Sequence, residues 1–391
     1  MNNNEEAIIL EVIGGVCAEL LEIVAERPTR RWYRDPHRGV NGLYEEEIVT
    51  WIDNERDDRF ERRFGISIST YTHLCDNLVD RGFTVRTGVT KGLCIYLYRI
   101  VSGVTWYVIE DIFKVPARTC IDLYHQYNDI LSNDYYREFV KVPTPDEMED
   151  SCKRYYHHNH IVGAIGAIDG THIPIQTQEL AYLNRKGFCS ITCQIFVDSY
   201  GRVLNLQTGT PGAIDDRTLW HSSNLKQWAE LYLPQLGRRI VDNCEIHYYI
   251  LGDGIYTMDT PVILCPYTEA ESELASRADR YAYNYGHSSC RIRVEQTIGY
   301  IKNKFRILKT EQKYGRTVED TVLHTSKTFE ACCVLWNMML MNGDISLGYD
   351  VDNLNDLPFP IIIPTEGAAI DGDTIRLTVM NHYLSEEYDH E

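Results

Sequence analysis

The sequence predicts an α/β protein in which a mixed β-sheet with flanking helices follows an all-helical segment. Residues 160–212 read as three successive strands separated by glycine-containing turns, and a fourth apolar run, 246–256, comes after a helix. Residues from about 44 to 132 instead show helical periodicity with few strand runs. Strands that alternate with helices in this order are typical of a mixed sheet covered by helices.

The chain has 391 residues, enough for two or more domains. We expect an N-terminal helix at 5–26 and then a connector rich in arginine. The remaining parts are a helical domain, an α/β domain and an acidic C-terminal tail. The expected boundaries of the four parts are 1–43, 44–150, 151–342 and 343–391.

Within the helical domain, the stretch 104–131 predicts two helices joined at Lys114-Val115-Pro116. A residue before proline is biased out of the helical region, and proline suits a first helical turn. This layout is helix-turn-helix-like. The second helix exposes Arg118, Asp122, His125 and Asp129, a poor set of charges for reading a major groove, so a structural helix pair is the better interpretation.

The α/β domain should continue with a helix from about Asp215-Asp216 to 233. A long basic helix is expected at 287–309, and a closing helix at 325–341 precedes the tail. From 344 to 391 there are eleven acidic residues and one basic residue, Arg376. A segment of this kind is usually a solvated tail or an interaction segment.

Composition limits the class of protein. The formal net charge of −19 argues against a globally basic nucleic-acid binder, although it says little about local patches. No apolar run is long enough to span a bilayer, and the N-terminus lacks the features of a secretory signal, so we expect an intracellular protein. The twelve cysteines are scattered and read as buried thiols in a reducing compartment. Zinc binding at Cys152, His157, His158 and His160 is less favoured than a polar connector.

Two aspartates pose a physical problem, because Asp169 interrupts a buried strand and Asp253 ends another. An isolated buried carboxylate is costly unless it is paired, protonated or bound to a cation. Each aspartate precedes a glycine, so a turn cap is the simpler explanation at either position. The two residues are 84 positions apart, so only the fold can bring them together.

A third acid lies on the predicted 287–309 helix. On a helical wheel, Glu295 is the only acid on a basic face, and it borders the apolar stripe. An Arg291–Glu295 ion pair on a solvated face would account for it, at about 0.3–0.5 kcal/mol. Together with the two aspartates, however, it suggests a site for one or two divalent cations, Mg²⁺ or Mn²⁺. The basic side chains on the same face would meet DNA phosphates: Arg291, Lys302, Arg306 and Lys309.

In this order, these residues resemble the DDE-type transposases of the PIF/Harbinger superfamily and the Harbinger transposase-derived nucleases, from about Arg30 to Asn342. The matching segments are "GAIDGTHIPI", "YLNRKGFCSITCQIFVD", "GTPGAIDDRTLWHSSNL", "LGDGIY", "YNYGHSSCRIRVEQTIGYIKNKFRIL" and "ACCVLWNMML". The resemblance implies that Asp169, Asp253 and Glu295 are the catalytic acids and metal ligands, and it places Asp216, rather than Asp215, at a further family aspartate.

The resemblance also implies an RNase H-like core at 151–342, a nuclear protein that is also found in the cytoplasm, and phosphodiester cleavage by metal-activated water. In transposition, strand transfer by the freed 3′ hydroxyl follows. Family members often act with a separate Myb/SANT-like DNA-binding protein, and a homo-oligomer is compatible with this activity. A second hypothesis is a catalytically silent DNA-associated adaptor. A third, a two-carboxylate hydrolase such as a glycosidase, does not explain the basic face around Glu295.

Overall fold

The computed structural model describes residues 39–256, 258, 260–271, 273–347, 359–360 and 370–388, with side chains up to 386. From Asn41 onward the chain forms one compact unit. The predicted 5–26 helix and the arginine-rich connector that follows it lie outside the described residues. No helix in the described part of the chain is both long enough and apolar enough to cross a membrane.

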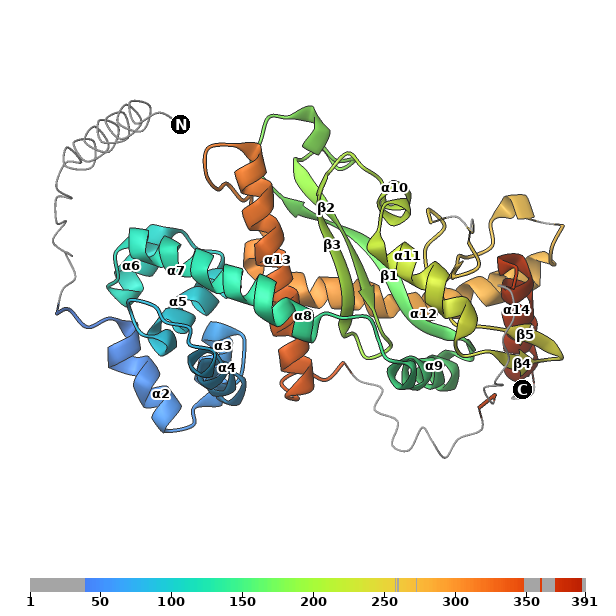
Figure 1. Ribbon diagram of the computed structural model, residues 1–391, viewed down its shortest axis with the longest axis horizontal. Coiled ribbons are helices and arrows are strands. Elements are labelled where there is room, and N and C mark those ends of the chain that lie inside the picture. The colour runs from blue at the N-terminus through green and yellow to red at the C-terminus, as the bar shows by residue number, and fades with distance from the viewer. Residues whose placement is uncertain are drawn as a thin grey trace, which may run out of the picture. The chain divides into compact units, whose positions relative to one another are not determined.

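The described residues before the sheet are helical (Figure 1). α5 is the most buried of these helices, and its neighbours pack around it. The expected helix pair is present as α6 and α7, which are separated by Lys114 in a left-handed conformation (φ 51°) and by Pro116 as the N-cap of α7. The bounds are α2 (Val49–Asp53), α3 (Asp57–Phe64), α4 (Ile68–Asp80), α5 (Val89–Ser102), α6 (Trp106–Phe113), α7 (Ala117–Ile130), α8 (Tyr136–Phe139) and α9 (Pro145–Asn159).

These helices lie in the same compact unit as the sheet. Tyr124 of α7 forms buried hydrogen bonds with Thr328 (2.6 Å) and Tyr314 (2.8 Å) in the C-terminal half of the chain. The expected domain boundary at residue 150 stays a prediction. The polar connector predicted around Cys152 is wrong as a local structure, because these residues belong to α9, which starts with a capping box between Thr144 and Glu147.

A five-stranded mixed sheet lies at the centre of the α/β part, in the order β3-β2-β1-β6-β7. The first three strands are antiparallel neighbours, whereas β6 runs parallel to β1 and β7 runs parallel to β6. This confirms the predicted mixed sheet and its strand-rich segments. The strands are β1 (Ala164–Pro174), β2 (Ser190–Val197), β3 (Val203–Pro211), β6 (Tyr249–Leu251) and β7 (Ile263–Leu264).

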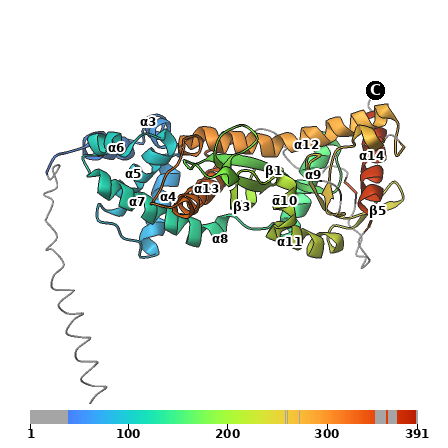
Figure 2. The ribbon, with the colours of Figure 1, turned by 90° about the horizontal axis from the view of Figure 1, so that it is seen from above.

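Both faces of the sheet are covered by helices. The side chains of Ala167 and Ile173 in β1 belong to the core that includes α12 (Arg277–Lys304) and α13 (Val318–Met341). Ile165 and Ile168 belong to a second core, with α9 and α11 (Asn224–Tyr232). Figure 2 shows α12 running along one side of the sheet. From Ala167 onward, alternate side chains of β1 face α12 or face away from it. Ile165 departs from this alternation because the register is irregular between Ala164 and Gly166.

Two segments differ from the prediction around the fourth strand. The helix expected from about Asp215 to 233 is divided into α10 (Asp216–His221) and α11. The break occurs because the Ser223 hydroxyl accepts a hydrogen bond from the Lys226 N–H (3.0 Å) and caps a new helix. A small antiparallel hairpin, β4 (Arg239–Val241) and β5 (Cys244–Ile246), was not predicted. Its strands are three residues long and carry too few residues for a periodic signal.

The long basic helix also has different bounds. α12 ends at Lys304 because Phe305 leaves the helical conformation (φ −104°, ψ 81°), and Arg306–Lys309 form a separate 3₁₀ turn, η6. The prediction of one continuous helix to 309 was therefore wrong. The helical wheel consequently does not apply to Arg306 and Lys309.

Part of the acidic C-terminal segment is folded rather than solvated. α14 (Gly372–Tyr388) packs against α12 and buries Ile375, Val379 and Tyr383. Gly286 of α12 permits this close approach, since a Cβ there would lie 2.6 Å from the Tyr383 ring. Of the two alternatives expected for this segment, a solvated tail is therefore wrong for these residues.

Candidate active site

Asp169 lies in the middle of β1, and its side chain is 21% exposed. Its Oδ1 accepts a hydrogen bond from the Gly170 N–H (2.9 Å) and lies 3.5 Å from Arg291 Nη2 of α12. Burial raises the pKa of Asp169 to about 6; Arg291 opposes the shift, whereas the nearby Asp253 and Asp216 add to it. The negative charge of the ionised Asp169 carboxylate is therefore only partly compensated.

Asp253 comes two residues after the end of β6, and its Oδ1 accepts a hydrogen bond from the Ile255 N–H (2.9 Å). The register of the parallel β1–β6 pair aligns Ala167 with Leu251. Asp169 and Asp253 each lie two residues beyond this pair, at the same edge of adjacent strands, which are about 4.8 Å apart in a sheet. The fold thus brings together the two aspartates that the sequence separates.

Glu295 projects from α12, and its side chain is 53% exposed. Its Oε1 lies 3.4 Å from Arg291 Nη2, the same nitrogen that lies 3.5 Å from Asp169. The predicted Arg291–Glu295 pair is therefore present. Arg291 also connects Glu295 to β1, a contact that the helical wheel could not reveal because it joins two elements.

Asp216 is a further acid at this site; the resemblance placed it at a family aspartate but did not include it among the catalytic acids or metal ligands. It is the first residue of α10, which is capped by the neighbouring Asp215 through the Thr218 N–H (2.8 Å). A Cβ on Gly170 would lie 2.0 Å from Asp216 Oδ1, so the carboxylate rests directly against the backbone of β1. Burial raises the pKa of Asp216, and Asp253 raises it further. The sequence feature that could have revealed this acid is the pair of aspartates in "AIDD", because one aspartate caps the helix and the next faces the sheet.

The donor chemistry of these acids suits a hard divalent cation. Carboxylate oxygens are preferred ligands of Mg²⁺. Burial is the main cause of the raised pKa of Asp169, and the nearby carboxylates of Asp253 and Asp216 add to it. Within the described ranges, no group of three or more His, Cys, Asp or Glu side chains stands close enough to hold a metal ion as the side chains are placed. The four acids of this site therefore offer the oxygen ligands that a divalent cation prefers, but their carboxylates do not converge on one point. They are Asp169, Asp216, Asp253 and Glu295.

The four predicted DNA-contacting residues differ in their positions. Arg291 is paired with Asp169 and Glu295, and its side chain is 12% exposed. Lys302 is turned inward: its Nζ donates to Thr171 Oγ1 (2.5 Å) and to the His172 carbonyl (2.8 Å), and burial lowers its pKa to about 8. The expectation that this ammonium faces DNA phosphates does not match its position. Arg306 and Lys309 are exposed on η6, where Lys309 Nζ donates to Asn303.

Comparison with known proteins shows which families this chain resembles. Residues 168–337 match the family model of a DDE superfamily endonuclease. The match covers β1, which carries Asp169, and extends through α12, which carries Glu295. No solved structure matches the chain.

The resemblance to Harbinger transposase-derived nucleases is confirmed by homology to individual proteins. The chain is 27% identical over 213 residues to the rat protein named "Putative nuclease HARBI1", covering 53% of this chain and 54% of that protein. Its identity to the Xenopus laevis protein of the same name is 22% over 233 residues, 59% of each chain. It is also 22% identical over 306 residues to the Arabidopsis thaliana "Protein ALP1-like", covering 74% of this chain and 72% of that protein. The chain spans roughly half to three fifths of the length of the HARBI1 relatives.

Proposed function

We propose that the protein is a metal-dependent DNA endonuclease of the DDE transposase type, with an RNase H-like core. The observation that carries the proposal is the placement of Asp169 and Asp253 at the same edge of adjacent parallel strands, where burial and neighbouring acids hold the pKa of Asp169 at about 6. The match to the DDE superfamily endonuclease family and the nuclease name of the HARBI1 relatives support this assignment.

In this proposal Asp169, Asp253 and Glu295 hold one or two Mg²⁺ or Mn²⁺ ions, and Asp216 adds negative charge beside them. When bound, the metal supplies an activated water and neutralises charge on the scissile phosphate. Arg291 acts as a positioning residue, because its guanidinium lies within 3.5 Å of both Asp169 and Glu295.

The exposed cations of η6, Arg306 and Lys309, would contact flanking DNA phosphates. Strand transfer, in which a freed 3′ hydroxyl attacks a phosphodiester, would use the same metal site. A Myb/SANT-like partner, a homo-oligomeric state and a nuclear location belong to this proposal as well. The helices that precede the sheet would form the helical N-terminal domain of such an enzyme. The α6–α7 pair is partly buried in the compact unit, which is compatible with DNA recognition by a partner.

An adaptor without catalytic activity is the second candidate function. The ion pairs of Arg291 favour it, because a single guanidinium lies within 3.5 Å of both Asp169 and Glu295 and partly compensates them without a metal. Such a protein would keep the fold and bind DNA, but it would not cleave it.

Nicking of a supercoiled plasmid in Mg²⁺ or Mn²⁺ separates the two functions. The wild type should nick the plasmid, Asp169→Asn and Asp253→Asn should not, and Ca²⁺ should support little turnover. Asp215→Asn is the matched control, since Asp215 adjoins Asp216 but is an exposed helix cap that asparagine can replace. Full activity of Asp253→Asn would refute the assigned site, and DNA binding by the wild type without nicking would support the adaptor.

A further inference from the structure

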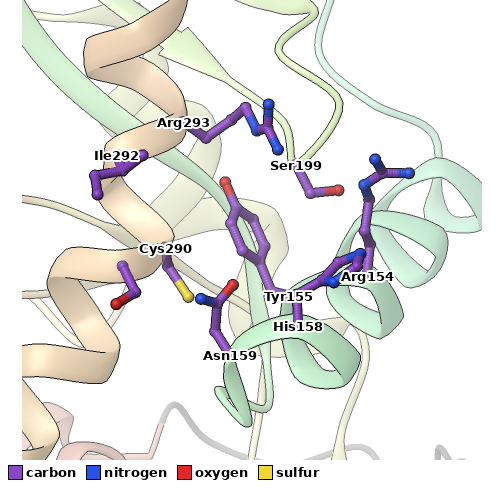
Figure 3. Close-up of a pocket in the computed structure, with 9 residues that line it drawn as sticks. Arg154, Tyr155, His158, Asn159, Ser199, Cys290, Ile292 and Arg293 are labelled. Atoms are coloured by element: carbon purple, nitrogen blue, oxygen red, sulfur yellow. The ribbon is translucent and has the colours of Figure 1, made fainter. Parts of the chain in front are cut away.

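A polar cavity lies away from the candidate active site, between α9, α12 and the turn that joins β2 to β3 (Figure 3). Its volume is about 240 Å³, less than the roughly 300–1,000 Å³ of sites for drug-sized ligands. It is lined mainly by groups that can donate hydrogen bonds, together with Cys290 and Ile292. The donors are Arg154, Tyr155, His158, Asn159, Ser199, Ser289 and Arg293.

The Tyr155 hydroxyl is the most informative group in this cavity. The Tyr155 side chain is only 3% exposed, and its buried hydroxyl has no hydrogen-bond partner among the described residues. Figure 3 shows the ring rising from α9 with the hydroxyl pointing toward the Arg293 side chain. A buried hydroxyl without a partner costs free energy, so an acceptor in the cavity would remove this cost.

Two guanidinium groups and one carboxylate, Asp198, act on the Tyr155 hydroxyl. Arg154 and Arg293 are 5% and 7% exposed and come from different helices. Arg154 stacks over the Tyr200 ring at 4.2 Å, and Arg293 Nη1 donates to the Leu347 carbonyl (3.3 Å), so both side chains are held in place. The nearby carboxylate of Asp198 is compensated by its own partner, Arg202, at 2.5 Å.

This cavity and the acidic site lie on different faces of α12. Arg293 and Glu295 are two residues apart and therefore about 160° apart around a helix of 3.6 residues per turn. A ligand of the cavity would thus not contact the carboxylates of the candidate active site.

We propose that this cavity binds a phosphate group, either as free inorganic phosphate or as a terminal phosphate of DNA. Two guanidinium groups and a hydroxyl approach from two helices, and Ser199 approaches from the strand turn. Donors that converge from several directions suit a tetrahedral oxyanion better than a planar carboxylate, and arginine is the preferred partner for phosphate.

Thermal unfolding of the full chain tests the proposal, with potassium phosphate compared against potassium chloride at equal ionic strength. Phosphate should raise the unfolding midpoint of the wild type beyond the effect of chloride. In Tyr155→Phe its affinity should fall about tenfold, because one hydrogen bond to a charged ligand is lost. Without phosphate this variant should be at least as stable as the wild type, so a folding defect would not mimic the result. Tyr281→Phe, an exposed tyrosine of the same helix as Arg293, is the control and should behave as the wild type.

A second arm identifies the source of the phosphate. A duplex with a 5′ phosphate should bind the wild type more tightly than the same duplex with a 5′ hydroxyl, and Tyr155→Phe should abolish the difference, if the natural ligand is a DNA end. An effect of inorganic phosphate alone would assign the cavity to a free anion. Equal stabilisation of the wild type and Tyr155→Phe by phosphate would overturn the proposal. Because both arms measure binding, their outcome is independent of nuclease activity.

Discussion

Replacing Asp169 by asparagine should stabilise the metal-free protein at pH 8. The pKa of Asp169 is raised from an ordinary value of 3.8 to about 6, mainly by burial. A raised pKa means that the folded state binds the proton more tightly than the unfolded state. The ionised carboxylate therefore makes the folded protein less stable.

The pH window follows from these two values. Below about pH 4 the carboxyl is protonated in both states, so it costs nothing. Between about pH 4 and pH 6 the unfolded chain ionises first and the cost grows, and above pH 6 it stays constant at about 3 kcal/mol. Asparagine still accepts the hydrogen bond from the Gly170 N–H and carries no charge. Because the pKa of about 6 already includes the attraction of Arg291, we expect a net gain of up to about 3 kcal/mol at pH 8.

Thermal unfolding at pH 5 and pH 8 in EDTA measures this effect. The midpoint of Asp169→Asn should exceed that of the wild type at pH 8, and the difference should shrink by about half at pH 5. Asp215→Asn is the control, because hydrogen bonds from Thr218 lower the pKa of this exposed cap and its contribution has the opposite sign. Saturating Mg²⁺ should stabilise the wild type more than Asp169→Asn. A variant less stable than the wild type by the same amount at both pH values would refute the reasoning.

Three further outcomes follow from the same site. Gly170→Ala should destabilise the fold by about 1–3 kcal/mol and reduce nicking, since its Cβ would clash with Asp216. Chemical denaturation measures the change in stability. Gly254→Ala is the matched control, because the added Cβ meets nothing within 4 Å. Lys302→Met should lower stability by about 1–3 kcal/mol, because it leaves the buried acceptors on β1 unpaired; an unchanged denaturation midpoint would contradict this. Arg306→Ala should reduce the salt dependence of DNA binding by about one phosphate contact, measured by salt titration, and an unchanged slope would place the DNA elsewhere.

The sequence was sufficient for the parts of the fold that carry a periodic signal. The strands around Asp169, the helix that carries Glu295 and the α6–α7 pair are all present in the structure. The β4–β5 hairpin and the capped break between α10 and α11 escaped prediction because each depends on a few residues and on local hydrogen bonds. The end of α12 escaped because apolar spacing continues through Phe305 while the backbone does not.

Side-chain direction was harder to predict than secondary structure. A helical wheel places Lys302 beside Glu295, but Lys302 reaches inward to β1, because the strand offers a hydroxyl and a carbonyl at this level. The wheel describes one helix in isolation and contains no information about acceptors on a neighbouring strand. The same limitation hid the contact of Asp216 with Gly170, which joins α10 to β1.

The position of Asp169 in a buried strand can now be explained without a choice between a structural and a functional role. The Gly170 N–H and Arg291 partly compensate the carboxylate, but burial, with smaller contributions from Asp253 and Asp216, keeps its pKa raised. If these contacts stabilised the charge fully, the pKa would lie below its ordinary value, as it does for Asp215. Folding therefore leaves negative charge at this edge of the sheet only partly balanced. Added positive charge, whether a proton or a divalent cation, would stabilise the folded protein at this edge.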